Sequence, residues 1–454
     1  MAVLVAAGAG IRPARALENL PKPPRVLFIA IDAVPFATMA ESAGDERNGF
    51  LQSLRGPVPL ISTFPSTTSL ALAAILRPIG VDGSPGYEAK HYEWTSNRVS
   101  GGGLFDYEPF PWRSFFDWKV ETLFRKAVSA IRPIKAARQD IRESLDAFLA
   151  SDRPIYFVYY DTTDSAGHLK SPKGLLPILA ELDHRLADAR REHPDDPFWT
   201  VIFSDHGMDG GKGLANTRAA VERALREAGF RLRPSIGGDG DVVIVPFGLV
   251  SSFVVYTAVG SEDDAARAMT RAKGVDLCVT RTTDGFRVEA ERGSAVIRRH
   301  PTDPPRWGYQ WSGEDPLWLS PRLHAAFADG GSISDGELFA ATVNDLYPDP
   351  FHRIASSFGE VENPASVVCS VARGHMYGAK ITALGSRVSV GRLKWTHGAL
   401  EYGASLGFLM SDVPSWRPLG PVRFDHALAP FTALWDGRGP RVEGAGSEPA
   451  AASQ

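Results

Sequence analysis

Cysteine is nearly absent from this sequence: its 454 residues include only two, Cys278 and Cys369. They lie far apart without the spacing of a metal-binding motif, so both are predicted to be buried apolar residues and not a disulfide framework. No run of residues is long and apolar enough to predict a membrane-spanning helix. No block of lysine or arginine stands out, and the net charge of -4 does not indicate nucleic-acid binding.

The N-terminal segment, residues 1–24, starts apolar and has no basic residue before Arg12. Because a secretory signal peptide begins with a positively charged region, this segment is predicted to be a flexible tail. A soluble, cytoplasmic protein is favoured, and export stays open if the N-terminus is a clipped signal peptide. Residues 438–454 are rich in small side chains and predict a second flexible tail. The sequence does not indicate an oligomeric state.

The chain is longer than the roughly 250–300 residues at which a single hydrophobic core stops growing. Continuous apolar strands, typical of a buried parallel sheet, are separated by helical patterns within residues 25–229. Residues 230–300 alternate short strands with one helix and predict a small α+β insertion that caps the core. Residues 301–437 would complete the core. The predicted fold class is α/β, with a mainly parallel central sheet flanked by helices.

Two of the apolar strands run directly into residues that can bind a metal. Asp32 follows the apolar run 25–31, and Asp205 and His206 follow the run 199–203. In open α/β sheets, ligands bind at the carboxyl ends of the strands. An aspartate at the end of a strand can also be an ordinary turn former, so each residue alone is ambiguous.

Further candidates follow a third strand and stand near the end of the chain. The apolar run 155–160 leads into a segment with Asp164 and His168, four residues apart, which we predict to be a tight loop. His397 precedes a glycine close to a last predicted strand, 403–410. A lone histidine is usually structural, but here it would complete a set.

A hydroxyl-rich segment, Ser62–Ser69, precedes a predicted helix of small and apolar residues, 70–76. Thr67 or Thr68 therefore lies at a helix N-terminus, where an N-cap is the commonest role. The alternative role is that of a nucleophile, because the free N–H groups and positive end of a helix suit a phosphate or sulfate oxygen. The next segment, 80–103, is predicted to be a long surface loop.

The candidates together are three carboxylates, three imidazoles and one hydroxyl: Asp32, Thr68, Asp164, His168, Asp205, His206 and His397. Nitrogen and oxygen ligands of this kind suit zinc first, with manganese as the alternative. Six carboxylate and imidazole ligands are too many for one catalytic zinc ion and suit two. We therefore predict a cofactor of two divalent metal ions.

In these motifs the sequence resembles the alkaline phosphatase superfamily, and within it the type I phosphodiesterase/nucleotide pyrophosphatase branch. The matching motifs occur in the family's order and are Ile31-Asp32, Pro65-Ser-Thr-Thr68, Asp164-Ser-Ala-Gly-His168, Ser204-Asp-His-Gly-Met208 and Thr396-His-Gly398. A sulfatase is not favoured, because that branch uses a nucleophile derived from cysteine or serine.

The resemblance implies which residues hold each metal ion. One ion would be held by Asp164, His168 and His397, and the other by Asp32, Asp205 and His206. Thr68 would be the nucleophile and would contact the second ion, with Thr67 and Thr63 as fallbacks.

The activity that the resemblance implies is hydrolysis of phosphodiester or pyrophosphate bonds through a phospho-threonine intermediate. The substrate would be a small-molecule phosphate ester or a nucleotide, with no nucleic-acid partner. One alternative is a phosphomonoesterase of the same superfamily. Another, from a different class, is a catalytically silent metal-binding scaffold.

Overall fold

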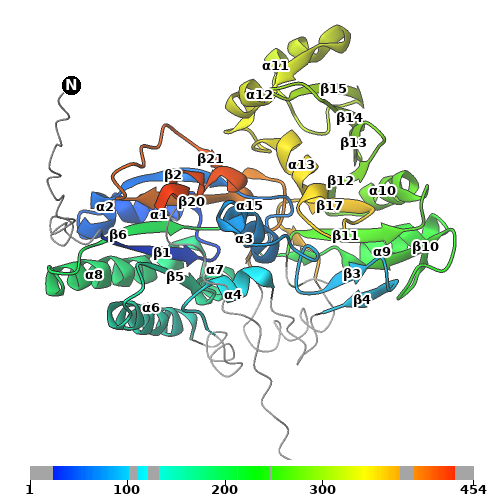
Figure 1. Ribbon diagram of the computed structural model, residues 1–454. Coiled ribbons are helices and arrows are strands. Elements are labelled where there is room, and N and C mark those ends of the chain that lie inside the picture. The colour runs from blue at the N-terminus through cyan, green and yellow to red at the C-terminus, as the bar shows by residue number, and fades with distance from the viewer. Residues whose placement is uncertain are drawn as a thin grey trace, which may run out of the picture.

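The computed structural model describes residues 24–101, 110–120, 132–211, 213–245, 248, 250–378 and 393–434. Both predicted tails, except residue 24, lie outside the described part of the chain. Two large sheets lie side by side, and a smaller lobe projects from the second one (Figure 1). None of the helices in the described ranges is long and apolar enough to cross a membrane.

The first sheet has the strand order β21-β2-β20-β6-β1-β5, and β20 alone runs against the other five strands. Its strands are β1 (Arg25–Ile31), β2 (Arg55–Ile61), β5 (Ile155–Tyr160), β6 (Phe198–Phe203), β20 (Leu406–Ser411) and β21 (Val422–Arg423). The predicted strands 25–31, 155–160 and 199–203 are confirmed almost residue for residue. The predicted α/β class with a mainly parallel sheet is also confirmed.

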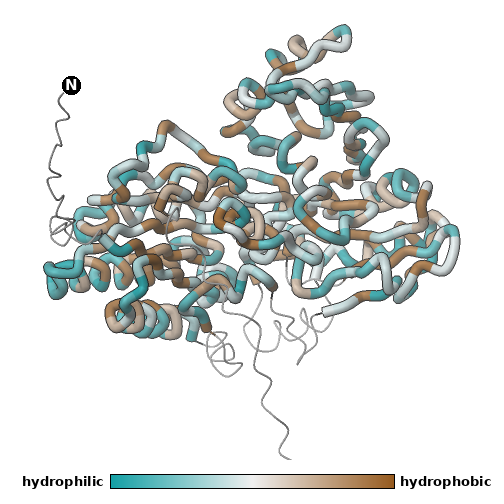
Figure 2. Tube along the Cα trace, viewed as in Figure 1, coloured by the Kyte–Doolittle hydropathy of each residue, from teal (hydrophilic) through white to brown (hydrophobic). Residues whose placement is uncertain are grey.

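Helices cover both faces of this sheet, and β1 is accordingly buried along its whole length. Alternate residues point to opposite faces of a strand. Leu27 and Ile29 pack towards α6 (Pro133–Ala150) and α8 (Leu176–Glu192), while Phe28 packs on the other face with α3 (Thr68–Leu76). Figure 2 shows hydrophobic and hydrophilic residues alternating along α6 and α8, as expected for helices with one buried side.

The other helices of the described residues are shorter and are spread over both halves of the molecule. They are α1 (Phe36–Ala43), α2 (Gly49–Ser53), α3 (Thr68–Leu76), α4 (Pro111–Phe115), α7 (Thr162–Lys170), α9 (Arg218–Glu227), α10 (Glu262–Thr270), α11 (Pro321–Phe327), α12 (Asp335–Thr342), α13 (Pro350–Gly359) and α15 (Tyr402–Ser405).

The second sheet has the strand order β16-β15-β14-β13-β12-β17-β11-β10-β9. Its strands are β9 (Arg231–Leu232), β10 (Asp241–Ile244), β11 (Ser252–Thr257), β12 (Val275–Arg281), β13 (Gly285–Ala290), β14 (Gly293–His300), β15 (Arg306–Gly313), β16 (Ser332–Ser334) and β17 (Val367–Val371). It therefore uses strands from beyond residues 230–300. The domain limits given above stay a prediction.

The prediction that the two cysteines are unpaired is wrong. Cys278 on β12 and Cys369 on β17 lie directly opposite each other in antiparallel register, and they form a disulfide. Both are fully buried and contribute to the apolar cluster beneath α9 and α10. Their sequence separation of 91 hid the pair, because only the strand pairing brings them together.

Two other local predictions need correction. The segment 80–103, as far as residue 101, is not simply a surface loop: β3 (His91–Glu93) and β4 (Arg98–Ser100) form a hairpin. Tyr87 just before it is fully buried, because its ring joins the core of the second sheet. The last predicted strand, 403–410, begins only at residue 406, since α15 precedes it.

Candidate active site

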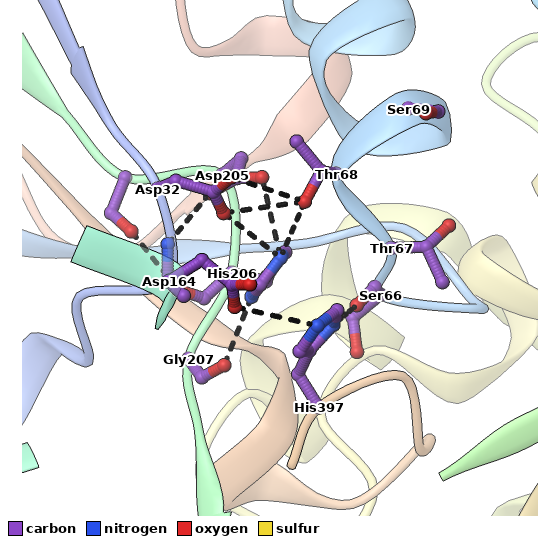
Figure 3. A network of polar contacts seen from close by, with 12 residues as sticks. Asp32, Ser66, Thr67, Thr68, Ser69, Asp164, Asp205, His206, Gly207 and His397 are labelled. Atoms are coloured by element: carbon purple, nitrogen blue, oxygen red, sulfur yellow. Dashed lines mark hydrogen bonds and ion pairs between the residues drawn. The ribbon is translucent and has the colours of Figure 1, made fainter. Parts of the chain in front are cut away.

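Five of the seven predicted site residues, all except Thr68 and His397, follow the carboxyl ends of three neighbouring strands. β1 lies between β5 and β6, with Ile31 in register with Tyr160 and Ala30 in register with Phe203. Side chains that follow these strands therefore emerge at one edge of the sheet. The structure brings all seven together there: Asp32, Thr68, Asp164, His168, Asp205, His206 and His397. Figure 3 shows six of them converging.

The first ligand group is buried and consists of Asp32, Asp205 and His206. The Nε2 atom of His206 lies 3.4 Å from Asp32 Oδ1 and 3.3 Å from Asp205 Oδ2. Gly207 lets this strand end approach α15, because a Cβ atom there would lie 2.4 Å from the carbonyl oxygen of Gly403. The small residue after His206 is therefore required by packing.

The second ligand group, Asp164, His168 and His397, is more open, with Asp164 one-quarter exposed. The Nε2 atoms of His168 and His397 lie 3.3 Å and 3.6 Å from Asp164 Oδ1. The prediction that Asp164 and His168 lie on a loop is wrong, because both are on α7. Their four-residue spacing puts them on one face of that helix, which aligns both ligands more firmly than a loop would.

All three imidazoles are oriented by main-chain carbonyl groups. The Nδ1 atoms of His168, His206 and His397 lie 2.7, 3.0 and 2.9 Å from the carbonyl oxygens of Trp395, Gly207 and Ser66. In the neutral ring, Nδ1 then carries the hydrogen and Nε2 keeps its lone pair. Metal-binding histidines are usually held this way.

Burial keeps two of the imidazoles neutral. It lowers the pKa of His206 to about 4 and, together with the adjacent His206 ring, lowers the pKa of His397 to about 3. The two rings stack with their centroids 4.0 Å apart. The two ligand groups therefore lie side by side and share one wall.

The carboxylates lack enough positive charge nearby. Burial, reinforced by Asp205 and Asp164, raises the pKa of Asp32 well above its usual range, and burial raises the pKa of Asp205 to about 7. Burial opposes the ionisation of Asp164 as well, but His168 and His397 outweigh it and lower the pKa of Asp164. Charged carboxylates this close in a buried space repel one another, and a bound cation would relieve that repulsion.

Thr68 differs from its two fallbacks in where its hydroxyl points. Its Oγ1 lies 3.2 Å from both Asp32 Oδ1 and His206 Nε2 (Figure 3). Thr67 is the N-cap of α3, and its hydroxyl donates to the carbonyl of Tyr87. The hydroxyl of Thr63 donates to the carbonyl of Pro65. Both fallback hydroxyls are thus buried and engaged elsewhere, and the geometry favours Thr68.

A cavity of about 310 Å³ opens beside Thr68 and the second ligand group. It is also lined by residues that the sequence interpretation did not assign, among them Glu88, Trp112, Tyr159 and Asp161. Tyr159 donates a 2.5 Å hydrogen bond to Asp32 Oδ2. Asp161 directly follows β5, so the same strand-end rule that found Asp32 would have indicated it. No comparable signal marked Glu88 or Tyr159.

No protein-family profile and no curated protein sequence matches this chain. Its fold is similar to that of solved ectonucleotide pyrophosphatase/phosphodiesterase 5 structures. For the murine protein the TM-score is 0.48 with 11% sequence identity, covering 93% of this chain and 98% of the other. An inactive murine variant in complex with AMP has a TM-score of 0.48 and 10% sequence identity, covering 93% of this chain and 97% of the other. The human protein has a TM-score of 0.48 and 10% sequence identity, covering 91% of this chain and 95% of the other. At this distance, function must be inferred from this chain's own residues.

Proposed function

We propose that this chain is a metal-dependent hydrolase of phosphodiester or pyrophosphate bonds that works through a phospho-threonine intermediate. The single observation that carries the proposal is the position of Thr68. Its hydroxyl is at the start of a helix, at the edge of a cavity, and 3.2 Å from members of a buried carboxylate–imidazole group. A capping hydroxyl would not need those neighbours.

The residues present fit two divalent metal ions. Among the described residues, Asp205 Oδ2 and Asp164 Oδ1 are buried acceptors without a hydrogen-bond donor, one in each group. Each group offers carboxylate oxygen and imidazole nitrogen, which suit zinc first and manganese next. One ion would be held by Asp164, His168 and His397, and the other by Asp32, Asp205, His206 and Thr68.

Two divalent cations, when bound, would neutralise the phosphate charge and make hydroxyl groups easier to deprotonate. The Thr68 hydroxyl faces Asp32 and His206, so its oxygen lies where a cation held by these two residues would ease the loss of its proton. Oγ1 would attack phosphorus in line, forming a new P–O bond while the bond to the leaving oxygen breaks and its alcohol departs with a proton. Water would then cleave the phospho-threonine and restore the hydroxyl.

The N-terminus of α3 would assist this reaction. The Thr68 amide is one of the first N–H groups of the helix and has no partner within it. It would donate to a non-bridging phosphate oxygen, where the positive end of the helix also favours negative charge. The chain's own contribution is therefore to orient the hydroxyl and to hold the phosphoryl group beside it.

The substrate proposed is a small phosphate ester or nucleotide, because the cavity of about 310 Å³ is of ligand size. The alternative activity is that of a phosphomonoesterase, and the alternative from a different class is a silent metal-binding scaffold. The unengaged acceptors fit both alternatives, and the placement of Thr68 supports an enzyme over a scaffold.

The test compares hydrolysis of bis(p-nitrophenyl) phosphate and p-nitrophenyl phosphate by zinc- or manganese-loaded protein. We expect turnover of the diester, and a strong monoester preference would favour the alternative activity. Negligible zinc after gentle purification, with no hydrolysis on adding Zn²⁺ or Mn²⁺, would favour the scaffold.

The Cys278–Cys369 disulfide bears on the compartment. Structural disulfides persist mainly in oxidising compartments. The pair therefore supports export over the cytoplasmic location that the N-terminal sequence favours. Mass spectrometry of protein alkylated during isolation from its native source tests this. Two alkylated thiols would show that the cysteines are reduced and would favour the cytoplasm.

A further inference from the structure

Glu88 is a carboxylate of the cavity wall that belongs to neither ligand group. The hydroxyl of Ser69 donates to its Oε2 over 3.4 Å. Ser69 is the second residue of α3 and is next to Thr68. The carboxylate of Glu88 therefore lies at the positive end of this helix, the place that the proposed mechanism gives to the phosphoryl group.

Glu88 also interacts electrostatically with the carboxylates of the two ligand groups. Burial, reinforced by the charge of Asp164, raises the pKa of Glu88 to about 7, and Asp205 adds to the effect. Glu88 thus interacts with carboxylates of both ligand groups. A charge that acts on Asp164 and Asp205 also acts on a phosphate bound between them.

We propose that Glu88 is a specificity-determining residue, which disfavours dianionic phosphate monoesters and polyanionic pyrophosphates relative to monoanionic phosphodiesters. The inference rests on the proposed function and narrows its substrate class. The carboxylate of Glu88 repels each additional negative charge on the substrate. The substrate cannot displace this carboxylate, because the hydroxyl of Ser69 in the cavity wall holds it.

The charge of the single carboxylate of Glu88 changes the net charge of the site. Two divalent cations would leave one positive charge over the three aspartates of the ligand groups, and Glu88 would cancel it. Asp161 and Arg113 also line the cavity, and their opposite charges offset each other. The site that a monoanionic diester enters is then nearly neutral. It has no net positive charge left to compensate a second negative charge on the substrate.

A purely structural role for Glu88 predicts something different. Glutamine has the same shape and keeps an acceptor for the Ser69 hydroxyl, so Glu88→Gln removes the charge and little else. If Glu88 only supports the loop, this variant treats both kinds of ester as the wild type does. If its charge selects the substrate, the two esters respond unequally.

The experiment measures kcat/KM for bis(p-nitrophenyl) phosphate and p-nitrophenyl phosphate with zinc-loaded wild type and Glu88→Gln, well above pH 7 so that the carboxyl is ionised. We expect the variant to raise the monoester-to-diester ratio about tenfold, mainly through KM of the monoester. The matched control is Glu93→Gln, a carboxylate five residues along that does not line the cavity, and it should leave the ratio unchanged. A Glu88→Gln ratio within about twofold of the wild type overturns the proposal.

A binding measurement separates this inference from the proposed function. Inorganic phosphate, a dianion at this pH, is titrated by calorimetry into zinc-loaded Thr68→Ala and into the same protein carrying Glu88→Gln. We expect the double variant to bind phosphate about tenfold more tightly. Equal affinities overturn the role of Glu88. If zinc-loaded wild type hydrolyses neither ester, the proposed function fails, and the phosphate titration still decides whether Glu88 selects by charge.

Discussion

The imidazole rings of His206 and His397 stack 4.0 Å apart and nearly parallel, although the two residues belong to different ligand groups and different parts of the chain. Because the rings are in contact, the two groups cannot be two unrelated sites. Their Nδ1 atoms face the carbonyls of Gly207 and Ser66, which turns both Nε2 atoms towards the carboxylates. The stacking therefore joins the two ligand groups into one site, the place of the proposed two-metal centre, and the first predictions concern its parts.

Thr68→Ala is expected to lower kcat for the diester by about 10³-fold or more, because it removes the only hydroxyl aimed at Asp32 and His206 among the three candidate threonines. Steady-state assays of the zinc-loaded variant measure this. Thr68→Ser is the matched control, since it keeps a hydroxyl and should retain part of the activity. A Thr68→Ala variant with the full wild-type rate would show that another group is the nucleophile.

Replacing one ligand residue should release the metal ion of its own ligand group and leave the ion of the other group bound. We expect Asp205→Asn and His168→Ala each to lower bound zinc by about one equivalent from the two proposed, because each disrupts one ligand group. Metal analysis after dialysis checks the expectation, with the exposed His300→Ala as control. Full zinc content in both variants would contradict the assignment of these groups as ligands.

Tyr159→Phe should weaken zinc binding or activity by about 10–100-fold, since Tyr159 orients Asp32 through a 2.5 Å hydrogen bond. Zinc titration against a competing chelator measures the effect separately from turnover. The neighbouring Tyr160→Phe serves as control, because its hydroxyl bonds Ser144 on the other face of the sheet. Equal effects of the two substitutions would assign the loss to packing and not to Asp32.

Arg353 ties two site segments together from α13. Its fully buried guanidinium donates to the carbonyls of Ser62 and Thr63 before Thr68 and of Leu400 after His397. Arg353→Lys leaves several of these acceptors unpaired and is expected to lower the free energy of unfolding by about 3 kcal/mol or more. Denaturant unfolding measures this, and the exposed Arg322→Lys is the control. Equal stability of both variants would refute this role.

Removing the disulfide should destabilise the second sheet. It closes a loop of 91 residues between β12 and β17, so replacing both Cys278 and Cys369 by alanine should cost about 2–5 kcal/mol of stability. Thermal unfolding with and without a reducing agent tests this. The wild type should lose stability on reduction, and the double variant should not respond. A wild type indifferent to reduction would mean that the bond contributes nothing.

The sequence predicted the part of the site that follows from local patterns. Asp32 comes directly after an apolar run, Asp205 and His206 come within three residues of another, and a strand ends where such a run meets polar residues. The prediction placed Asp164 and His168 on a loop because their segment includes a glycine and short polar residues, and this prediction was wrong. Packing on the sheet nevertheless makes it helical, and tertiary contacts override weak local propensity.

Residues brought in by neighbouring chain segments were not predictable. Glu88 comes from a segment that looked like a surface loop, and Tyr159 looked like one more apolar strand residue. The disulfide partners carry no local signal either. What each of these residues does depends on a contact with a residue far away in the chain, and a single sequence does not specify such contacts.

By itself the sequence determined the strand ends that bear ligand-type residues and the helix that follows the hydroxyl-rich segment 62–69, because hydrophobic periodicity and chain order fix these locally. Only the tertiary structure decided that the two ligand groups touch, that Thr68 and neither Thr67 nor Thr63 faces them, and that Glu88 lies beside them. The physical reason is strand order and tertiary packing: β1 is inserted between β5 and β6, which brings Asp32, Asp164 and Asp205 to one edge of the sheet, and segments distant in the chain add Thr68, His397 and Glu88 there.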